Sequence, residues 1–242
     1  MTSTLPSLRV AFRPADLGES DIQQLPTATV VVIDVLRATT VMTAATRAGC
    51  RSIRTVDSIP AAIQLRDAAT AGGKTQTLLC GERGGLPIDG FDLGNSPRLY
   101  TPRRVAGRDL IITTTNGTVA IATVANAQAI YAASFWNLQS TINRLRQQPN
   151  VLLLCAGTNG EVTAEDVLLA GAITSGLQKD RKFHQNDAAI IAAAFWQSES
   201  EVPLAQRLRK TQGGINLSTL GLVADVDDCA AIDVHNDVVQ LA

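Results

Sequence analysis

The sequence predicts an α/β fold: a three-layer sandwich in which a largely parallel or mixed sheet is flanked by helices. Three observations support it. Short apolar runs rich in Val, Ile and Leu recur along the 242 residues, segments with helical periodicity lie between many of them, and several runs lead directly into polar loops that open the next helix. Strands covered by helices on both faces appear in a sequence as such near-continuous apolar runs.

The predicted strands are short buried runs bounded by polar or turn-forming residues. At 45% hydrophobic residues, the chain can bury a large core between them. In chain order the strands are LRVAF (8–12), TVVVI (29–33), TLLC (77–80), DLIIT (109–113), AIYA (129–132) and VLLLC (151–155).

Helices are predicted where apolar residues recur at helical spacing. Segments 41–48 and 169–177 each place small or apolar residues on one face. Residues 58–73 begin at Ser58, carry Pro60 in the first turn and end at glycines, which is the usual punctuation of a helix.

We expect one α/β domain over residues 1–242. The charge pattern changes in residues 201–221, so a smaller carboxy-terminal lobe with a boundary near 200 stays open as an alternative.

Composition excludes several classes of partner. A net charge of −1 gives no broad basic field for nucleic acid or an anionic membrane. No stretch reaches the roughly 18 apolar residues of a spanning helix. The four cysteines are far apart with no C-x-x-C pair, which predicts neither a zinc site nor a disulfide framework. We therefore expect a cytoplasmic protein with reduced thiols.

Three predicted strands run directly into polar loops of small residues. These loops are DVLRATT after strand 29–33, TTNGT after 109–113 and AGTNGEVTAED after 151–155. Because the carboxyl ends of parallel strands lie on one edge of a sheet, the loops are expected to meet in one crevice. Helix amino termini there present unpaired N–H groups and partial positive charge, which suits phosphate or another small anion.

The first loop carries the strongest candidates. Asp34 follows four β-branched residues at a strand end, and Thr39 and Thr40 are better placed than Asp34 to cap the following helix, so Asp34 is expected to bind a divalent cation. Arg37 is suited to a two-pronged contact with phosphate or carboxylate. A surface ion pair is the alternative for Arg37.

The second loop combines backbone freedom with hydroxyl groups. Asn116 and Gly117 tolerate left-handed backbone angles, and Thr115 and Thr118 flank them at a helix start. A plain turn and an anion-binding nest both fit this pattern.

The third loop begins near Gly157 and reaches a helix start. Thr163 and Asp166 have the spacing of a capping box, with Asp in place of the preferred Glu. Glu165 points elsewhere around the helix, so one of the two acids is expected to cap while the other faces the crevice and binds a cation.

Three later acids resemble a calcium loop only superficially. Asp225, Asp227 and Asp228 lack the glycine and terminal glutamate of an EF-hand, and they are predicted to be surface or helix-end acids.

Four long motifs occur in a fixed order: IDVLRATTVMTAA, GERGGLPIDGFDLGNSP, TTTNGT and CAGTNGEVTAEDVLLAG. This set resembles that of the 2-phosphosulfolactate phosphatase family, from about Val32 to Gly171, with a weaker echo in residues 212–230. Val41 and Thr211 stand where many members carry threonine and serine. The resemblance implies a magnesium-dependent acid phosphatase that converts 2-phospho-3-sulfolactate to sulfolactate and phosphate, a step toward coenzyme M.

The resemblance also makes the glycine-rich segment 80–97 a fourth wall of the crevice. Ser96 would cap a helix that has Pro97 in its first turn. The residues expected to act in catalysis are Asp34, Arg37 and Glu82. Those expected to hold Mg²⁺ are Asp34, Glu82, Glu165 and Asp166. Those expected to contact substrate are Thr39, Thr40, Arg83, Asn95, Arg98, Thr115, Asn116, Gly117, Thr118 and Gly157.

Attack by water is the expected reaction. A covalent phosphate on Asp34 ranks second, because the D-x-D-x-T signature is absent. The expected partner is a small anionic phosphorylated substrate, with neither nucleic acid nor membrane; a homo-oligomer stays open. The alternatives are a phosphatase of another phosphorylated 2-hydroxy acid and a non-catalytic protein that binds an anionic metabolite.

Overall fold

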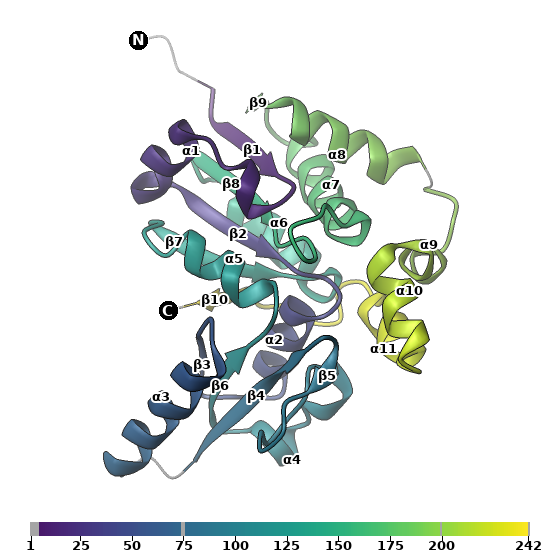
Figure 1. The fold of residues 1–242 in the computed structure, drawn as a ribbon. Coiled ribbons are helices and arrows are strands. Elements are labelled where there is room, and N and C mark those ends of the chain that lie inside the picture. Colours follow the sequence, from purple (N-terminus) through teal and green to yellow (C-terminus); the bar gives the residue numbers. More distant parts are fainter. Residues whose placement is uncertain (1–4, 74–75, 199, 242) are drawn as a thin grey trace.

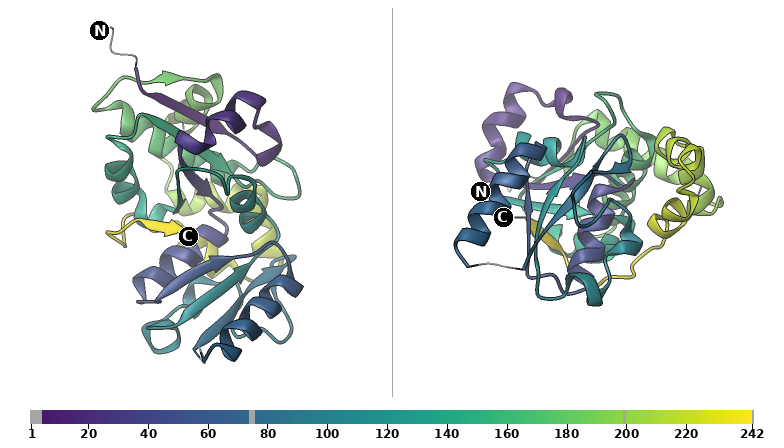
Figure 2. Two further views of the ribbon diagram at one scale, coloured as in Figure 1. Left: turned by 90° about the vertical axis from the view of Figure 1, so that its left-hand side faces the viewer. Right: turned by 60° about the horizontal axis from the view of Figure 1, so that its bottom comes forward.

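The computed structural model describes residues 5–73, 76–198 and 200–241. It confirms the α/β fold, with mixed and mostly parallel sheets flanked by helices (Figure 1). The strands divide between two sheets instead of joining one. Figure 2 shows the second sheet beneath the first in its left view.

The larger sheet has six strands within the described residues, and it is parallel except for the edge strand β10. Its order is β10 (Val239–Leu241), β7 (Ala129–Ala133), β2 (Thr29–Ile33), β8 (Asn150–Cys155), β1 (Ser7–Ala11) and β9 (His184–Gln185).

The smaller sheet has four strands in the part of the chain that the structure describes. Its first three strands are parallel, and the last two form an antiparallel hairpin. Its order is β3 (Ser52–Thr55), β6 (Asp109–Thr113), β4 (Thr77–Arg83) and β5 (Leu86–Pro87).

The apolar runs of the central strands serve two cores at once. Successive side chains of a strand point to opposite faces. In β2, Val31 and Ile33 belong to one core cluster, whereas Val30 and Val32 belong to the other. This two-sided burial explains why β2 has no polar alternation.

Helices complete the layers on both sides of the sheets. Those of the first core are α6 (Leu138–Leu145), α7 (Ala164–Gln178) and α8 (Asp187–Ser198). The second core, between the two sheets, holds α2 (Ala38–Arg47) and α5 (Gly117–Thr123). The outer face of the smaller sheet is covered by α3 (Ile59–Ala71).

The remaining helices lie outside these layers. In the first half of the chain they are α1 (Glu19–Gln24) and α4 (Pro102–Val105). The carboxy-terminal group consists of α9 (Leu204–Lys210), α10 (Gln212–Thr219) and α11 (Val223–Cys229). This group shares the first core through Leu208, Leu217 and Val226. The predicted single domain and the alternative lobe boundary near 200 both stay predictions.

The predicted helix at 58–73 is present as α3, and the Ser58 hydroxyl accepts a hydrogen bond from the Ala61 N–H. The predicted strand at 77–80 is longer than expected, because β4 runs on to Arg83 and turns through Gly84 and Gly85 into β5. No helix among the described residues has the length and apolar character to span a bilayer.

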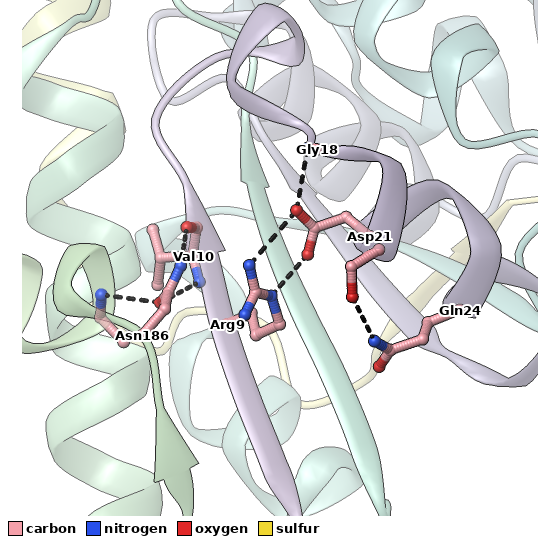
Figure 3. Close-up of polar contacts among 8 residues, drawn as sticks. Arg9, Val10, Gly18, Asp21, Gln24 and Asn186 are labelled. Carbon is pink, nitrogen blue, oxygen red and sulfur yellow. Dashed lines mark hydrogen bonds and ion pairs between the residues drawn. The ribbon is translucent and has the colours of Figure 1, made fainter.

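One side chain completes the hydrogen bonding of β1 beyond its short neighbour β9. Asn186 accepts from the Val10 N–H at 3.1 Å and donates to the Val10 carbonyl at 2.9 Å, as Figure 3 shows. On the same strand, Arg9 forms an ion pair with Asp21 of α1. These contacts anchor β1 to the segments before α8 and in α1.

Candidate active site

A cavity of about 410 Å³ lies where the loops after β2, β6 and β8, together with the β4–β5 hairpin, face helix α10. The structure thus brings together residues that the sequence separates by up to 186 positions, from 34 to 220. The lining residues are Asp34, Leu36, Arg37, Glu82, Gly84, Gly85, Asn95, Thr115, Asn116, Thr158, Asn159, Gly213, Asn216, Leu217, Thr219 and Leu220.

Asp34 itself supplies the cap that the sequence assigned to the threonines. Its Oδ1 accepts from the Ala38 N–H at 3.1 Å, in the first turn of α2. The Thr39 hydroxyl exchanges hydrogen bonds with the Asp34 backbone, and the Thr40 hydroxyl donates to the Val35 carbonyl. The expectation that Thr39 or Thr40 caps the helix was therefore wrong, because both hydroxyls shape the turn.

Asp166 organises the loops instead of closing a capping box. Its carboxylate accepts from the Val35 N–H at 2.8 Å and from the Gly157 N–H at 3.2 Å. The Thr163 hydroxyl donates to Asp166 at 3.0 Å and makes no cap hydrogen bond to the helix backbone. The predicted capping box was wrong, since the two carboxylate oxygens are used to hold the first and third loops together.

Glu82 performs the same task for the other two loops. Its Oε2 accepts from the Gly85 N–H at 2.7 Å, and its Oε1 accepts from the Thr115 N–H at 2.8 Å. Each oxygen thus has a backbone donor, and Glu82 fixes the hairpin against the second loop while still lining the cavity.

Glu165 is a buried acid with one carboxylate oxygen that accepts no hydrogen bond within the described part of the chain. Its Oε2 is buried and has no hydrogen-bond partner. Its other oxygen lies so close to Gly213 of α10 that a Cβ there would stand 2.0 Å from it. Similarly, no hydrogen bond from a described residue reaches Oδ2 of Asp34, which lies against Gly117.

Burial and mutual repulsion raise the pKa values of these acids. Burial raises the pKa of Asp34 to about 7, and the negative charges of Glu82 and Glu165 raise it further. The hydrogen bond from the Ala38 N–H and the positive charge of Arg37 lower this pKa and so offset part of the rise. Burial also raises the pKa of Glu165. The pKa of Asp166 rises through burial and then through the charges of Asp34 and Glu165. A cation placed among these carboxylates would relieve this cost.

The donor set fits a hard cation. It consists of carboxylate oxygens, which hard cations prefer. Among them, the buried Oε2 of Glu165 accepts no hydrogen bond from the residues that the structure describes and is therefore available to coordinate a cation. Over residues 5–73, 76–198 and 200–241, no three His, Cys, Asp or Glu side chains form a ready metal cage. This arrangement suits Mg²⁺, which usually takes one or two carboxylates and completes its shell with water and substrate phosphate oxygens.

Arg37 is buried at the cavity wall and held by two acceptors. Its Nη1 donates to Asp225 at 2.5 Å and its Nη2 donates to the Gly85 carbonyl at 2.6 Å. Asp225 does lie at a helix end, in the first turn of α11, but it is not a surface acid, because its side chain is only 4% exposed in this ion pair. Its neighbours Asp227 and Asp228 do lie in more exposed ion pairs, with Arg209 and Arg98.

The glycine-rich segment is ordered by a tight hairpin. Gly84 and Gly85 have φ angles of +59° and +82°, the left-handed values that a two-residue hairpin of type I′ requires. The pair of adjacent glycines between two strand-like runs was a sequence signal for this turn. The hairpin brings the Gly85 carbonyl to Arg37 and its N–H to Glu82.

The second and third loops are joined directly. The Asn116 side-chain oxygen accepts from the Asn159 N–H at 3.0 Å. Thr118 is tied to Thr114 by hydrogen bonds, away from the cavity lining. Gly157 has φ +65°, and a Cβ there would stand 2.4 Å from the Glu161 carbonyl oxygen, so the turn needs glycine.

Several predicted contact residues lie outside the cavity lining. Arg83 donates to the Glu82 carbonyl and to the Thr113 hydroxyl, and Arg98 forms an exposed ion pair with Asp228. Asn95 does line the cavity.

The predicted Ser96 cap was wrong. Pro97 does stand in the first turn of the short 3-10 helix Pro97–Leu99, but Ser96 makes no cap hydrogen bond. Its hydroxyl donates instead to Asp225 at 2.7 Å.

Helix α10 is a wall that the sequence reasoning missed. Gly213, Asn216, Leu217 and Leu220 recur at helical spacing and line the cavity together. That spacing was the available signal.

Comparison with known proteins identifies the family of this chain. A family model described as 2-phosphosulpholactate phosphatase matches residues 13–242. A Thermotoga petrophila protein named "Probable 2-phosphosulfolactate phosphatase" is 36% identical over 214 residues, 88% of this chain and 88% of that protein. A Symbiobacterium thermophilum protein of the same name is 38% identical over 204 residues, 84% of this chain and 86% of that protein. The chain belongs to the 2-phosphosulfolactate phosphatase family.

Proposed function

We propose that this protein is a magnesium-dependent phosphatase that hydrolyses 2-phospho-3-sulfolactate to sulfolactate and phosphate. Family membership supports the reaction and the substrate class. The structural observation that carries the proposal is the Arg37 guanidinium and the Asp34 carboxylate at one cavity of about 410 Å³, with the charge of the buried Glu165 acting on Asp34.

Asp34 and Glu165 are the residues that would hold Mg²⁺. Their free oxygens distinguish them from Glu82 and Asp166, whose oxygens already accept backbone N–H groups. We therefore assign Glu82 and Asp166 to positioning the loops. Bound there, the ion would neutralise charge on the phosphoryl group and lower the pKa of a bound water.

Arg37 would bind the phosphoryl group. An arginine carries five N–H donors, and the structure shows two of those of Arg37 in use, which leaves three. In phosphoryl transfer, positioning and charge stabilisation supply most of the catalysis. The rest of the cavity offers neutral donors, Asn95, Asn116 and Asn216 among them, to the carboxylate and sulfonate of the substrate.

The attacking water must give up a proton. Because Asp34 and Glu165 would be occupied by Mg²⁺, whose charge would relieve their raised pKa values, the proton would pass to bulk solvent. Direct attack by water remains our first mechanism, and a covalent phosphate on Asp34 our second.

A panel assay tests the proposal. Phosphate release is measured from 2-phospho-3-sulfolactate and from phosphorylated 2-hydroxy acids without the sulfonate, each with Mg²⁺ and with EDTA. We expect fast, magnesium-dependent release from phosphosulfolactate. Faster release from the other esters would reassign the substrate, and binding without release would make the protein an anionic-metabolite receptor.

A further inference from the structure

We propose that Asp225 is a positioning residue that holds the Arg37 guanidinium in its phosphate-binding orientation, which rests on the proposed function. Asp225 lies on α11, 188 positions from Arg37, and outside the four long motifs, within the weaker echo at residues 212–230. It does not line the cavity, so any effect on the substrate passes through Arg37.

Both oxygens of Asp225 are committed. Oδ2 accepts from Nη1 of Arg37 at 2.5 Å, and Oδ1 accepts from the Ser96 hydroxyl at 2.7 Å. On the other side of the guanidinium, Nη2 donates to the Gly85 carbonyl at 2.6 Å. The guanidinium is therefore clamped between α11 and the β4–β5 hairpin, and the Asp225 carboxylate is itself oriented by a third segment.

Stability alone does not account for this pair. The side chains of Arg37 and Asp225 are 3% and 4% exposed, and taking two charges out of water offsets most of their attraction. Two fixed acceptors instead restrict the rotamers of a long, flexible side chain before substrate arrives. Such preorganisation lowers the cost of binding an anion.

Helix α11 offers a matched control. Asp227 lies two residues from Asp225 and pairs with Arg209, with side chains 39% and 46% exposed. Asp227 carries the same charge as Asp225 on the same helix, but its ion pair is with Arg209 and not with Arg37. Asp227→Asn should leave activity and phosphate binding unchanged.

The test measures binding of inorganic phosphate by calorimetry, alongside phosphatase kinetics and thermal unfolding. Asp225→Ala should weaken phosphate binding about tenfold and lower kcat/KM by a similar factor. Asp225→Asn, which keeps hydrogen-bonding groups at both positions, should recover most of the loss. In a double-mutant cycle, Arg37→Ala with Asp225→Ala should be no worse than Arg37→Ala alone, because one residue acts through the other.

Ser96→Ala covers the case in which Asp225→Ala does not fold. It removes only the outer hydrogen bond, and we expect phosphate binding to weaken about two- to fivefold with little change in the melting temperature.

Contrary outcomes separate the two proposals. Unchanged or tighter phosphate binding in the Asp225 and Ser96 variants, with Arg37→Ala impaired, would overturn the positioning role and leave the proposed function intact. Additive losses in the cycle would do the same. A wild-type protein that neither binds phosphate nor releases it from phosphosulfolactate would overturn both.

Discussion

Asp34→Asn should stabilise the protein at pH 8 in the absence of metal while abolishing its magnesium-stimulated phosphatase activity. Burial raises the pKa of Asp34 from 3.8 to about 7. Between these values the folded state binds the proton more tightly than the unfolded state, so this group lowers the free energy of unfolding progressively as pH rises through the window. Asparagine carries no charge at any of these pH values and still offers an oxygen to the Ala38 N–H.

The size of the effect follows from the shift. About 3 pKa units correspond to roughly 4 kcal/mol above pH 7. The repulsion is shared with Glu165, whose pKa is also raised, so we expect a net gain of at least about 1 kcal/mol in the variant. For a chain of this size, each kcal/mol moves the melting temperature by about 2–4 °C.

The assay is urea unfolding of wild type and Asp34→Asn in EDTA at pH 5 and pH 8. The advantage of the variant should grow with pH, whereas Asp227→Asn should show no such trend. Added Mg²⁺ should then stabilise the wild type and leave Asp34→Asn unchanged, because a ligand stabilises only the state that binds it. A stability difference that is equal at both pH values, or an asparagine variant that is weaker at pH 8, would refute the reasoning.

Three further substitutions probe separate parts of the account. Arg37→Ala should lower kcat/KM at least tenfold, about 1.4 kcal/mol, while Arg98→Ala, in its exposed ion pair, should not; equal kinetics for the two would exclude the phosphate contact. Gly157→Ala should lower the melting temperature and the activity together, because its φ of +65° and the nearby Glu161 carbonyl leave no room for a Cβ; an unchanged melt would show that the loop adapts. Asn186→Ala should cost about 1–3 kcal/mol of stability with KM unchanged, since it leaves the Val10 N–H and C=O unpaired, and a shifted KM would contradict this purely structural role.

Strands that are buried on both faces were the most predictable part of the fold. The strands at 29–33 and 109–113 have the predicted bounds, because apolar runs without polar alternation have few other structures available. The division into two sheets was not predictable, since an apolar pattern marks a strand but does not identify its neighbour. Edge strands such as β3 and β10 are short and only partly buried, so their pattern is weak.

Site residues in the loops that follow strands could be predicted from the sequence, whereas those on the carboxy-terminal helices could not. Asp34 directly follows β2 and Asn116 lies three residues beyond the end of β6, so topology alone placed them near the crevice. Asp225 had no such signal: its role depends on α11 packing beside a loop encoded 188 positions earlier. Asp166 was misassigned because helix-start spacing describes local hydrogen bonds, whereas one of its oxygens accepts from Val35, 131 positions away in the first loop.

The most direct test of the central claim is a crystal grown with Mn²⁺, as an anomalous substitute for Mg²⁺, and inorganic phosphate. The account predicts a manganese peak within about 2.0–2.4 Å of a carboxylate oxygen of Asp34 and of Glu165, with phosphate against Arg37. A metal bound at another part of the protein, or phosphate seated away from Arg37, would contradict it.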